Sequence, residues 1–195
     1  TGLATRYLIV GDDFRFGKKR EGDFKLLKQY SSKYAFIIEN IAGVCIDNQR
    51  VSSSTIRALL AKGFFEVSEK FLGRPFSISG RVAHGDKQGR TIGFPTANIS
   101  IKRELSPVLG VFCVNIQINN KTYNGVCNVG KRPTRGGTDI LLEVYIFDFN
   151  KEIYGARVDV IFKQKIRDEI KFDSFKELKK QIQRDTESAI KYFSL

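Results

Sequence analysis

The sequence predicts an α/β segment over residues 1–74, followed by a small antiparallel β-barrel with a closing helix over residues 75–195. Three observations lead to this fold class. Short apolar runs alternate with amphipathic stretches in the first third, up to Gly73-Arg74-Pro75, where glycine and proline mark a boundary. Several alternating segments without intervening helices then follow. The final stretch has the apolar spacing of a helix.

Apolar runs and amphipathic stretches define the elements expected in the first part. Their order is a strand at 7–10, a helix at 19–30, a strand at 35–38, a helix from Ile56 to Gly63 and a helix at 64–72. Ser53 and Ser54 precede the helix at Ile56 and suit its N-terminal cap. Short apolar strands of this kind are typical of a parallel sheet that is buried on both faces.

The second part is expected to be a meander of strands. The strands expected are 111–118, 123–129, 141–149 and 157–162, with Asn119-Asn120 as a hairpin turn. Ser174 and Glu177 have the spacing of a capping box, which predicts a helix start. The side chains expected on the apolar face of this helix are Phe175, Leu178, Ile182, Ala189, Ile190 and Phe193.

Composition limits the classes of function. Hydrophobic residues make up 42% of the chain, which is enough for a packed core, and no apolar run is long enough to span a bilayer. We therefore expect a cytoplasmic protein without a membrane partner. Cys45, Cys113 and Cys127 are expected to be free, buried thiols, and with His84 as the single histidine they fit no zinc pattern.

The formal net charge of +12 favours anionic ligands. It fits either a basic surface that attracts small anions such as ATP or one that binds nucleic acid. The excess is spread over both parts of the chain, and no long basic arm exists. Gly125 to Lys131 has the spacing of a P-loop, but Arg132 follows where a serine or threonine would bind Mg²⁺. A P-loop is therefore not predicted.

The most informative stretch runs from Gly80 to Asn98 and reads GRVAHGDKQGRTIGFPTAN. Its glycines allow a backbone to approach phosphate oxygens closely and to present several N–H donors. Thr96 and Asn98 are alternate residues, so in an extended chain their side chains project from one face. Both supply neutral oxygens of the kind that Mg²⁺ shares with phosphates. A glycine-rich loop that leads into an edge strand remains the simpler alternative.

This stretch resembles the signature of the riboflavin kinase family. Four later segments match the family in order: Gly110-Val111-Phe112, Asn128 to Thr134, Leu142-Glu143-Val144 and Ile166 to Phe172. Tyr145 stands where the family often has histidine, which excludes a catalytic histidine there. The resemblance covers the chain from about Leu72 to its end, and it implies a six-stranded barrel.

The resemblance also implies the site and its substrates. ATP and riboflavin would be the substrates, FMN and ADP the products and Mg²⁺ the cofactor, in a monomer or weak oligomer that binds no nucleic acid. Glu143 would accept the proton of the riboflavin 5′-hydroxyl. Thr96 and Asn98 would hold the metal. The nucleotide-binding residues would be Gly80, Gly85, Lys87, Gly89, Arg90, Pro95, Thr96 and Asn98. The flavin-binding residues would be Asn128, Arg132 and Arg167, although an ion pair of Arg167 with Asp168 or Glu169 is a nearly equal alternative.

Residues 1–74 resemble the second half of an FMN adenylyltransferase domain with a Rossmann-like nucleotidyltransferase fold. The residues that would remain of its site are Asp13, Phe14, Arg15, Ser53, Ser54 and Arg57. The family's H-x-G-H motif has no counterpart, and methionine is absent, so we expect the chain to begin inside that domain. FAD synthesis from FMN is therefore expected only of the intact parent protein.

Two other functions remain open. A small basic barrel could bind single-stranded nucleic acid, with Tyr123, Tyr145 and Phe147 as stacking surfaces. A remnant could bind nucleotide or flavin without turnover. A single assay separates the three possibilities: riboflavin, ATP and Mg²⁺ are supplied, and FMN is detected.

Overall fold

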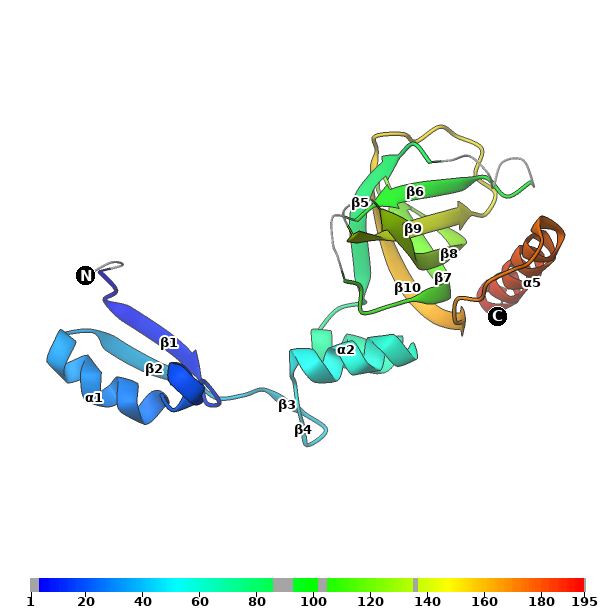
Figure 1. Cartoon of the computed structure of the whole chain (residues 1–195). Coiled ribbons are helices and arrows are strands. Elements are labelled where there is room, and N and C mark those ends of the chain that lie inside the picture. Colours follow the sequence, from blue (N-terminus) through cyan, green and yellow to red (C-terminus); the bar gives the residue numbers. More distant parts are fainter. Residues whose placement is uncertain (1–3, 86–92, 102–104, 135–136, 195) are drawn as a thin grey trace. The chain divides into compact units, whose positions relative to one another are not determined.

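The computed structural model describes residues 4–85, 93–101, 105–134 and 137–194, with the backbone alone at 132–134 and 137–138. Contacts divide the chain into two compact units, Thr1–Ser52 and Ser53–Leu195 (Figure 1). The two helices before residue 75 belong to the same compact unit as the barrel. The expected domain boundary between residues 74 and 75 stays a prediction.

The first unit is built on a two-stranded parallel sheet. β1 (Tyr7–Gly11) pairs with β2 (Ile37–Ile41), and α1 (Phe24–Tyr34) connects them. A 3₁₀ turn, η1 (Lys18–Arg20), precedes α1. The helix expected from residue 19 begins at Phe24, because the Asp23 side chain accepts a hydrogen bond from the Leu26 N–H and so caps it. A hairpin of β3 (Cys45–Ile46) and β4 (Gln49–Arg50) follows.

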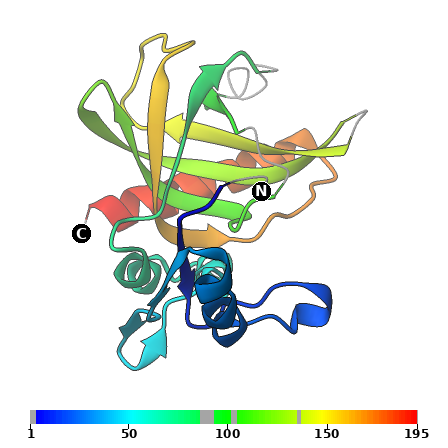
Figure 2. The same cartoon turned by 90° about the vertical axis from the view of Figure 1, so that its left-hand side faces the viewer.

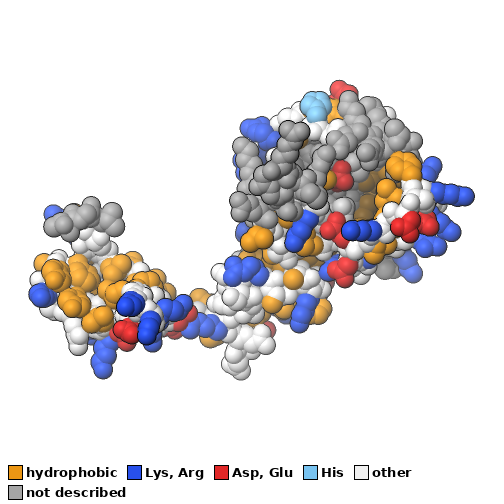
Figure 3. Space-filling model, in the orientation of Figure 1, with side chains coloured by type: hydrophobic (Ala, Val, Ile, Leu, Met, Phe, Trp, Pro, Cys, Tyr) orange, Lys and Arg blue, Asp and Glu red, His pale blue; other side chains and the backbone are white. Residues whose placement is uncertain are grey.

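The expectation of a sheet buried on both faces is wrong for the described part of this unit. Val10 is buried, but the opposite face exposes apolar side chains, and Figure 3 shows such side chains gathered on this unit. The exposed residues are Tyr7, Ile9, Ile37 and Ile41. Strands alternate their side chains between faces, so α1 can cover only one of the two faces.

The second unit begins with two helices. α2 (Ser53–Lys62) and α3 (Phe65–Leu72) meet at Gly63, whose φ of 80° suits glycine. Leu60 and Phe65 are buried in the main apolar cluster of the barrel. These two helices therefore close one end of the barrel core.

The predicted six-stranded antiparallel barrel is confirmed. Its strands are β5 (Ser77–Ala83), β6 (Thr96–Ser100), β7 (Gly110–Ile118), β8 (Lys121–Thr134), β9 (Gly137–Ile146) and β10 (Arg157–Arg167). They close in the order β10-β5-β6-β9-β8-β7, and every neighbouring pair is antiparallel. A closed barrel has no free sheet edge.

Alternation along the strands separates an inner face from an outer face. The buried inner side chains include Ile99, Phe112, Val129, Leu142, Val144 and Val160. Helix α5 (Phe175–Phe193) packs on the outer face, where Ala189 joins Val111, Cys113 and Val126 in a second cluster. Figure 2 shows α5 behind the strands of the barrel. The Ser174 side chain accepts a hydrogen bond from the Glu177 N–H, which confirms the predicted start of this helix.

Candidate active site on the outer face of the barrel

Three of the predicted site residues lie side by side on adjacent strands. Asn98 of β6 is paired in register with Glu143 of β9, which is in turn paired with Asn128 of β8. Their strand neighbours Ile99 and Val144 point into the core, so all three side chains project from the outer face. Facing residues on adjacent strands are neighbours, so a carboxyl group lies between two carboxamides.

Thr96 extends this group along β6. It lies two residues before Asn98, on the same face, and is paired in register with Tyr145. Thr96 is exposed and Asn98 is partly buried. The structure therefore places a hydroxyl and a carboxamide next to each other and beside Glu143.

The same cross-strand row continues around the barrel to Arg167. Asn128 is paired with Val111 of β7, and Val111 is paired with Arg167 of β10. Register shifts in β10 between Phe162 and Gln164 and between Lys165 and Arg167 bring Arg167 into this row. The row therefore joins residues predicted for the metal, for catalysis and for flavin binding.

Gly85 lies against the Asn98 side chain. A Cβ added at Gly85 would overlap with the Asn98 carboxamide, so only glycine leaves room for it. Gly85 is the last described residue of this part of the glycine-rich stretch, and it lies directly against Asn98, the candidate metal ligand. The predicted nucleotide-binding residues Lys87, Gly89 and Arg90 lie outside the described residues.

Gly80 lies away from this group. Gly80 lies in β5 and is paired in register with Val158 of β10. It comes three residues before Ala83, which is the residue of β5 opposite Asn98. A Cβ at Gly80 would press on the Ile99 side chain and on the backbone of β6. Close strand packing thus accounts for this glycine, and its role in nucleotide binding stays a prediction.

Aromatic side chains border the polar group. The rings of Phe94 and Tyr145 meet edge to face at 5.3 Å, and those of Tyr145 and Phe147 at 5.7 Å. Tyr145 and Phe147 also pack against the cluster beneath α5. The outer face therefore offers an aromatic, apolar surface next to the Glu143 carboxyl group.

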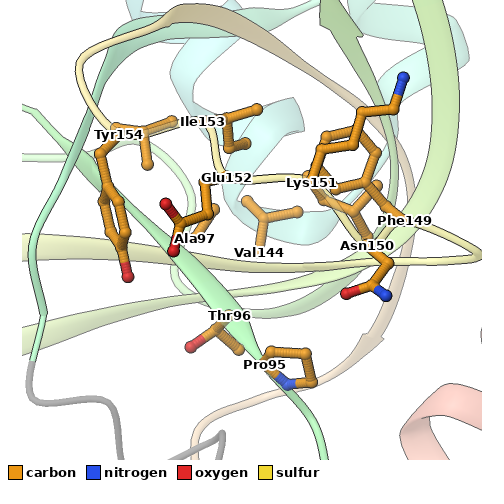
Figure 4. A pocket seen from close by; sticks show the side chains of 12 residues that line it. Pro95, Thr96, Ala97, Val144, Phe149, Asn150, Lys151, Glu152, Ile153 and Tyr154 are labelled. Carbon is orange, nitrogen blue, oxygen red and sulfur yellow. The ribbon is translucent and has the colours of Figure 1, made fainter.

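A cavity of about 200 Å³ opens beside Thr96 at one end of the barrel. Core side chains, among them Val144, and residues from Phe149 to Tyr154 line it, and Pro95 and Thr96 form its rim. In Figure 4 the Glu152 carboxylate and the Tyr154 hydroxyl point toward the side on which Thr96 lies. Pockets that bury a whole drug-sized ligand measure about 300–1,000 Å³, so this cavity suits a single ring system.

Arg167 is held by helix α5. Its Nε and Nη2 donate to the Asp185 carboxylate at 3.0 and 2.7 Å, and Nη1 donates to the Asp168 carbonyl oxygen at 2.9 Å. The alternative of an ion pair with Asp168 or Glu169 is therefore wrong, since the partner carboxylate is that of Asp185. The side chain of Arg132 lies outside the described part of the chain.

The three cysteines are free, as expected, but only two of them are buried. Burial raises the pKa of the Cys113 thiol to about 11 and raises that of Cys127 well above its usual value. Cys45 is exposed, which corrects the expectation for that residue.

The residues that resemble an adenylyltransferase site fall into both units. In the first unit the Asp13 carboxylate lies 3.2 Å from Arg50, and the Phe14 ring stacks on Phe16. Asp12 also pairs with Arg50, and the pKa of Asp12 is lowered, first by a hydrogen bond from the Gly43 N–H. The Arg15 side chain donates to the Phe14 carbonyl oxygen. Ser53, Ser54 and Arg57 lie on α2 in the second unit.

Sequence reasoning missed two features beside the candidate site. One is the loop that covers the cavity with Asn150, Glu152 and Tyr154, which have no recognisable spacing. The other is Asp185, a buried carboxylate that lies between Ile182 and Ala189 on the apolar stripe of α5. A charged residue inside the apolar stripe of a helix was the available signal, because such a group needs a partner when it is buried.

Comparisons with known proteins agree with the arrangement of the second unit. A family model described as riboflavin kinase matches residues 72–193, and one described as FAD synthetase matches residues 1–55. A solved structure named as a macrolide-efflux protein from Streptococcus pneumoniae has a TM-score of 0.68 at 36% identity. The match covers 91% of this chain and 58% of the Streptococcus pneumoniae chain.

Two curated relatives are named bifunctional riboflavin kinase/FMN adenylyltransferase. The protein of Haemophilus influenzae is 49% identical over 98% of this chain, and that of Escherichia coli K12 is 46% identical over 99%. The chain spans 63% and 62% of their lengths. The riboflavin kinase model matches more than half of the residues, so the chain belongs to the riboflavin kinase family.

Proposed function

We propose that this chain transfers the terminal phosphate of ATP to the 5′-hydroxyl of riboflavin and releases FMN and ADP. The observation that carries the proposal is the pairing of Asn98 with Glu143, with Thr96 two residues away on the same face. Phosphoryl transfer depends mainly on positioning and on charge neutralisation. This group supplies oxygen ligands and a carboxyl group at one level of the barrel.

The cavity beside Thr96 supports a place for the base of ATP. Its apolar walls suit a planar ring, and the polar groups of Asn150 and Glu152 at its edge suit the edge of a base. A nucleotide whose base lies there would extend its phosphates past Thr96 toward Asn98. The glycine-rich segment that begins at Gly85 would then supply N–H donors to these phosphates.

The donors at the site fit a magnesium ion. The Thr96 hydroxyl and the Asn98 carboxamide oxygen are hard, neutral ligands, and Mg²⁺ prefers such oxygens together with water and substrate phosphates. A bound Mg²⁺ would neutralise charge on the phosphates. Thr96 and Asn98 would hold it, and Gly85 would leave space for the carboxamide.

Glu143 would act on the acceptor alcohol. Its carboxylate would take the proton of the 5′-hydroxyl, while the oxygen forms a bond to the γ-phosphorus and the bond from that phosphorus to the bridging oxygen of ADP breaks. Asn128, on the other side of Glu143, could donate its N–H groups to the ribityl chain or to the new phosphate. The charge that ADP gains would stay with the nucleotide side of the site.

The flavin ring has an apolar place next to this chemistry. The aromatic group of Phe94, Tyr145 and Phe147 lies on the same outer face as Glu143. An isoalloxazine ring stacks or packs well on such side chains. Binding in this position would turn the ribityl chain toward Glu143.

The parent protein would have a second activity. The match of residues 1–55 to FAD synthetase supports the proposal that the intact protein also joins FMN to AMP to form FAD. The kinase would then supply the substrate of the adenylyltransferase within one chain.

A direct assay tests the kinase. The purified chain is incubated with riboflavin, ATP and Mg²⁺, and FMN is separated from riboflavin by chromatography and detected by fluorescence. FMN and ADP should form in equal amounts. Binding of riboflavin and ATP without FMN would reduce the chain to a binding remnant, and tight, salt-sensitive binding of single-stranded nucleic acid without turnover would favour the other alternative.

A further inference from the structure

Asp185 is a buried carboxylate that the proposed chemistry does not use. It lies in the middle of α5 and is only 4% exposed. Arg167 forms an ion pair with it, and the Gln181 side chain donates to it at 2.9 Å. A buried charge is costly unless it is fully paired. An apolar residue at this position would pack α5 against the barrel without that cost, so the charge of Asp185 calls for an explanation other than packing.

The guanidinium of Arg167 connects three segments. Two of its nitrogens donate to Asp185 on α5, and Nη1 donates to the Asp168 carbonyl oxygen at 2.9 Å. The central carbon of the guanidinium, Cζ, lies 5.8 Å from the centre of the Phe172 ring. Arg167 itself ends β10. One side chain thus ties a barrel strand to α5 and to the turn at residues 168–172.

This connection lies on the row of site residues. Arg167, Val111, Asn128 and Glu143 follow one another across four strands. With strands about 4.8 Å apart, Arg167 lies about 10 Å from Asn128 along the sheet and about 14 Å from Glu143. A riboflavin molecule with its 5′-hydroxyl at Glu143 and its ring on the aromatic group could therefore bring its ribityl chain next to Asn128, at the edge of the 168–172 turn.

The turn also reaches back over this row. A Cβ added at Gly130 would overlap with the Glu169 carboxylate and would lie 3.3 Å from the Asn128 carboxamide nitrogen. Glu169 therefore lies close to Asn128. The position of the turn decides what surrounds Asn128, and Arg167 holds that turn at its first residue, Asp168.

Arg167 is poorly placed to bind a phosphate directly. Its bidentate contact with Asp185 occupies the fork that would otherwise accept a phosphate, and the Asp185 carboxylate balances its charge. We propose that Asp185 is a positioning residue: by holding Arg167, it fixes the 168–172 turn against which riboflavin binds. This inference rests on the proposed riboflavin site.

The test compares two substrates in one set of variants. Asp185→Asn keeps the shape of the side chain and removes its charge. It should raise the Kd and the KM for riboflavin about tenfold or more, the effect of losing a hydrogen bond between charged groups. The KM for ATP and kcat should change by less than about threefold. Glu187→Gln, on the exposed side of the same helix, is the matched control and should leave all these values unchanged.

Arg167→Lys is the second variant, because it keeps the charge but loses the planar fork. It should weaken riboflavin binding as Asp185→Asn does, and the double variant should be no worse than the poorer single variant. If Asp185→Asn does not fold, the riboflavin affinity of Arg167→Lys alone tests the positioning role. Unchanged riboflavin affinity, or an equal rise in both KM values, would overturn the positioning role.

Riboflavin binding, followed by the quenching of its fluorescence, separates this inference from the kinase. If the unaltered chain binds riboflavin without forming FMN, the kinase proposal fails, and the binding data still decide the role of Asp185. If the unaltered chain binds no riboflavin, both proposals are overturned.

Discussion

Asn98 and Glu143 face each other across neighbouring antiparallel strands, with both side chains on the outer face of the barrel. They are 45 positions apart in the sequence numbering. The register of β6 and β9 alone brings them together, and Gly85 presses against the Asn98 carboxamide from the adjoining segment. With Asn98 as the proposed metal ligand and Glu143 as the proposed general base, one strand pair would hold both in place, and they would need little rearrangement to act together.

The first prediction concerns the oxygen ligands. Thr96→Ala and Asn98→Ala should each weaken Mg-ADP binding more than about tenfold, because each removes one oxygen donor. Titration calorimetry with and without Mg²⁺ measures the effect. Ser100→Ala is the matched control, since Ser100 is the next outward residue on β6. An equal loss in the control, or no loss in either variant, would contradict the ligand role.

The second prediction concerns Gly85. An alanine there would displace the Asn98 carboxamide, whose flexible end can move at little cost to the fold. Gly85→Ala should therefore weaken Mg-ADP binding about as much as Asn98→Ala does, with a midpoint of thermal unfolding close to that of the unaltered chain. Normal nucleotide binding in Gly85→Ala would show that the contact with Asn98 has no function.

The third prediction concerns Gly110, where β7 begins. Its φ is 119°, and a Cβ would overlap with the Arg167 carbonyl oxygen. Gly110→Ala should lower the free energy of unfolding by more than about 1 kcal/mol. Gly155→Ala is the control, because its φ is also positive but nothing lies within 4 Å of the added Cβ. Denaturant unfolding should show the larger loss for Gly110→Ala.

The fourth prediction concerns thiol reactivity. The pKa of Cys113 is raised to about 11 by burial, so at pH 8 almost all of this thiol is in its protonated, unreactive form, and burial also raises the pKa of Cys127 well above its usual value. A disulfide reagent should therefore modify the exposed Cys45 rapidly in the folded chain and the other two only after unfolding. Rapid modification of all three thiols without denaturant would contradict the packing beneath α5.

Much of the fold could be predicted from local patterns. Four of the six barrel strands alternate regularly, and the Ser174 cap marks the start of α5, so these were found from the sequence pattern, whereas the number of six strands came from the family resemblance. The apolar face of α5 was predicted less well. Phe175 and Ile190 are about half exposed, and Asp185 takes an inward position. Periodicity shows a charge within the apolar stripe, but it cannot show which residue pairs with Asp185, because the partner Arg167 lies on strand β10.

The candidate site was predictable as residue types but not as an arrangement. Thr96 and Asn98 share a face because alternate residues on a strand do so. Their position beside Glu143 depends on strand order and register, which a single sequence does not encode locally. The cavity also stayed hidden, because Thr96 and the loop with Glu152 meet only after the barrel closes.

The fifth prediction tests the central claim, that the Asn98–Glu143 pair is the site of phosphoryl transfer. Glu143→Gln keeps the size of the side chain and removes the base, so the initial rate of FMN formation should fall about 10²- to 10⁴-fold. Mg-ADP and riboflavin should still bind with affinities close to those of the unaltered chain. The measurement is FMN formation under saturating ATP and riboflavin, with both affinities determined on the same preparation. Turnover within about threefold of the unaltered chain would contradict the account.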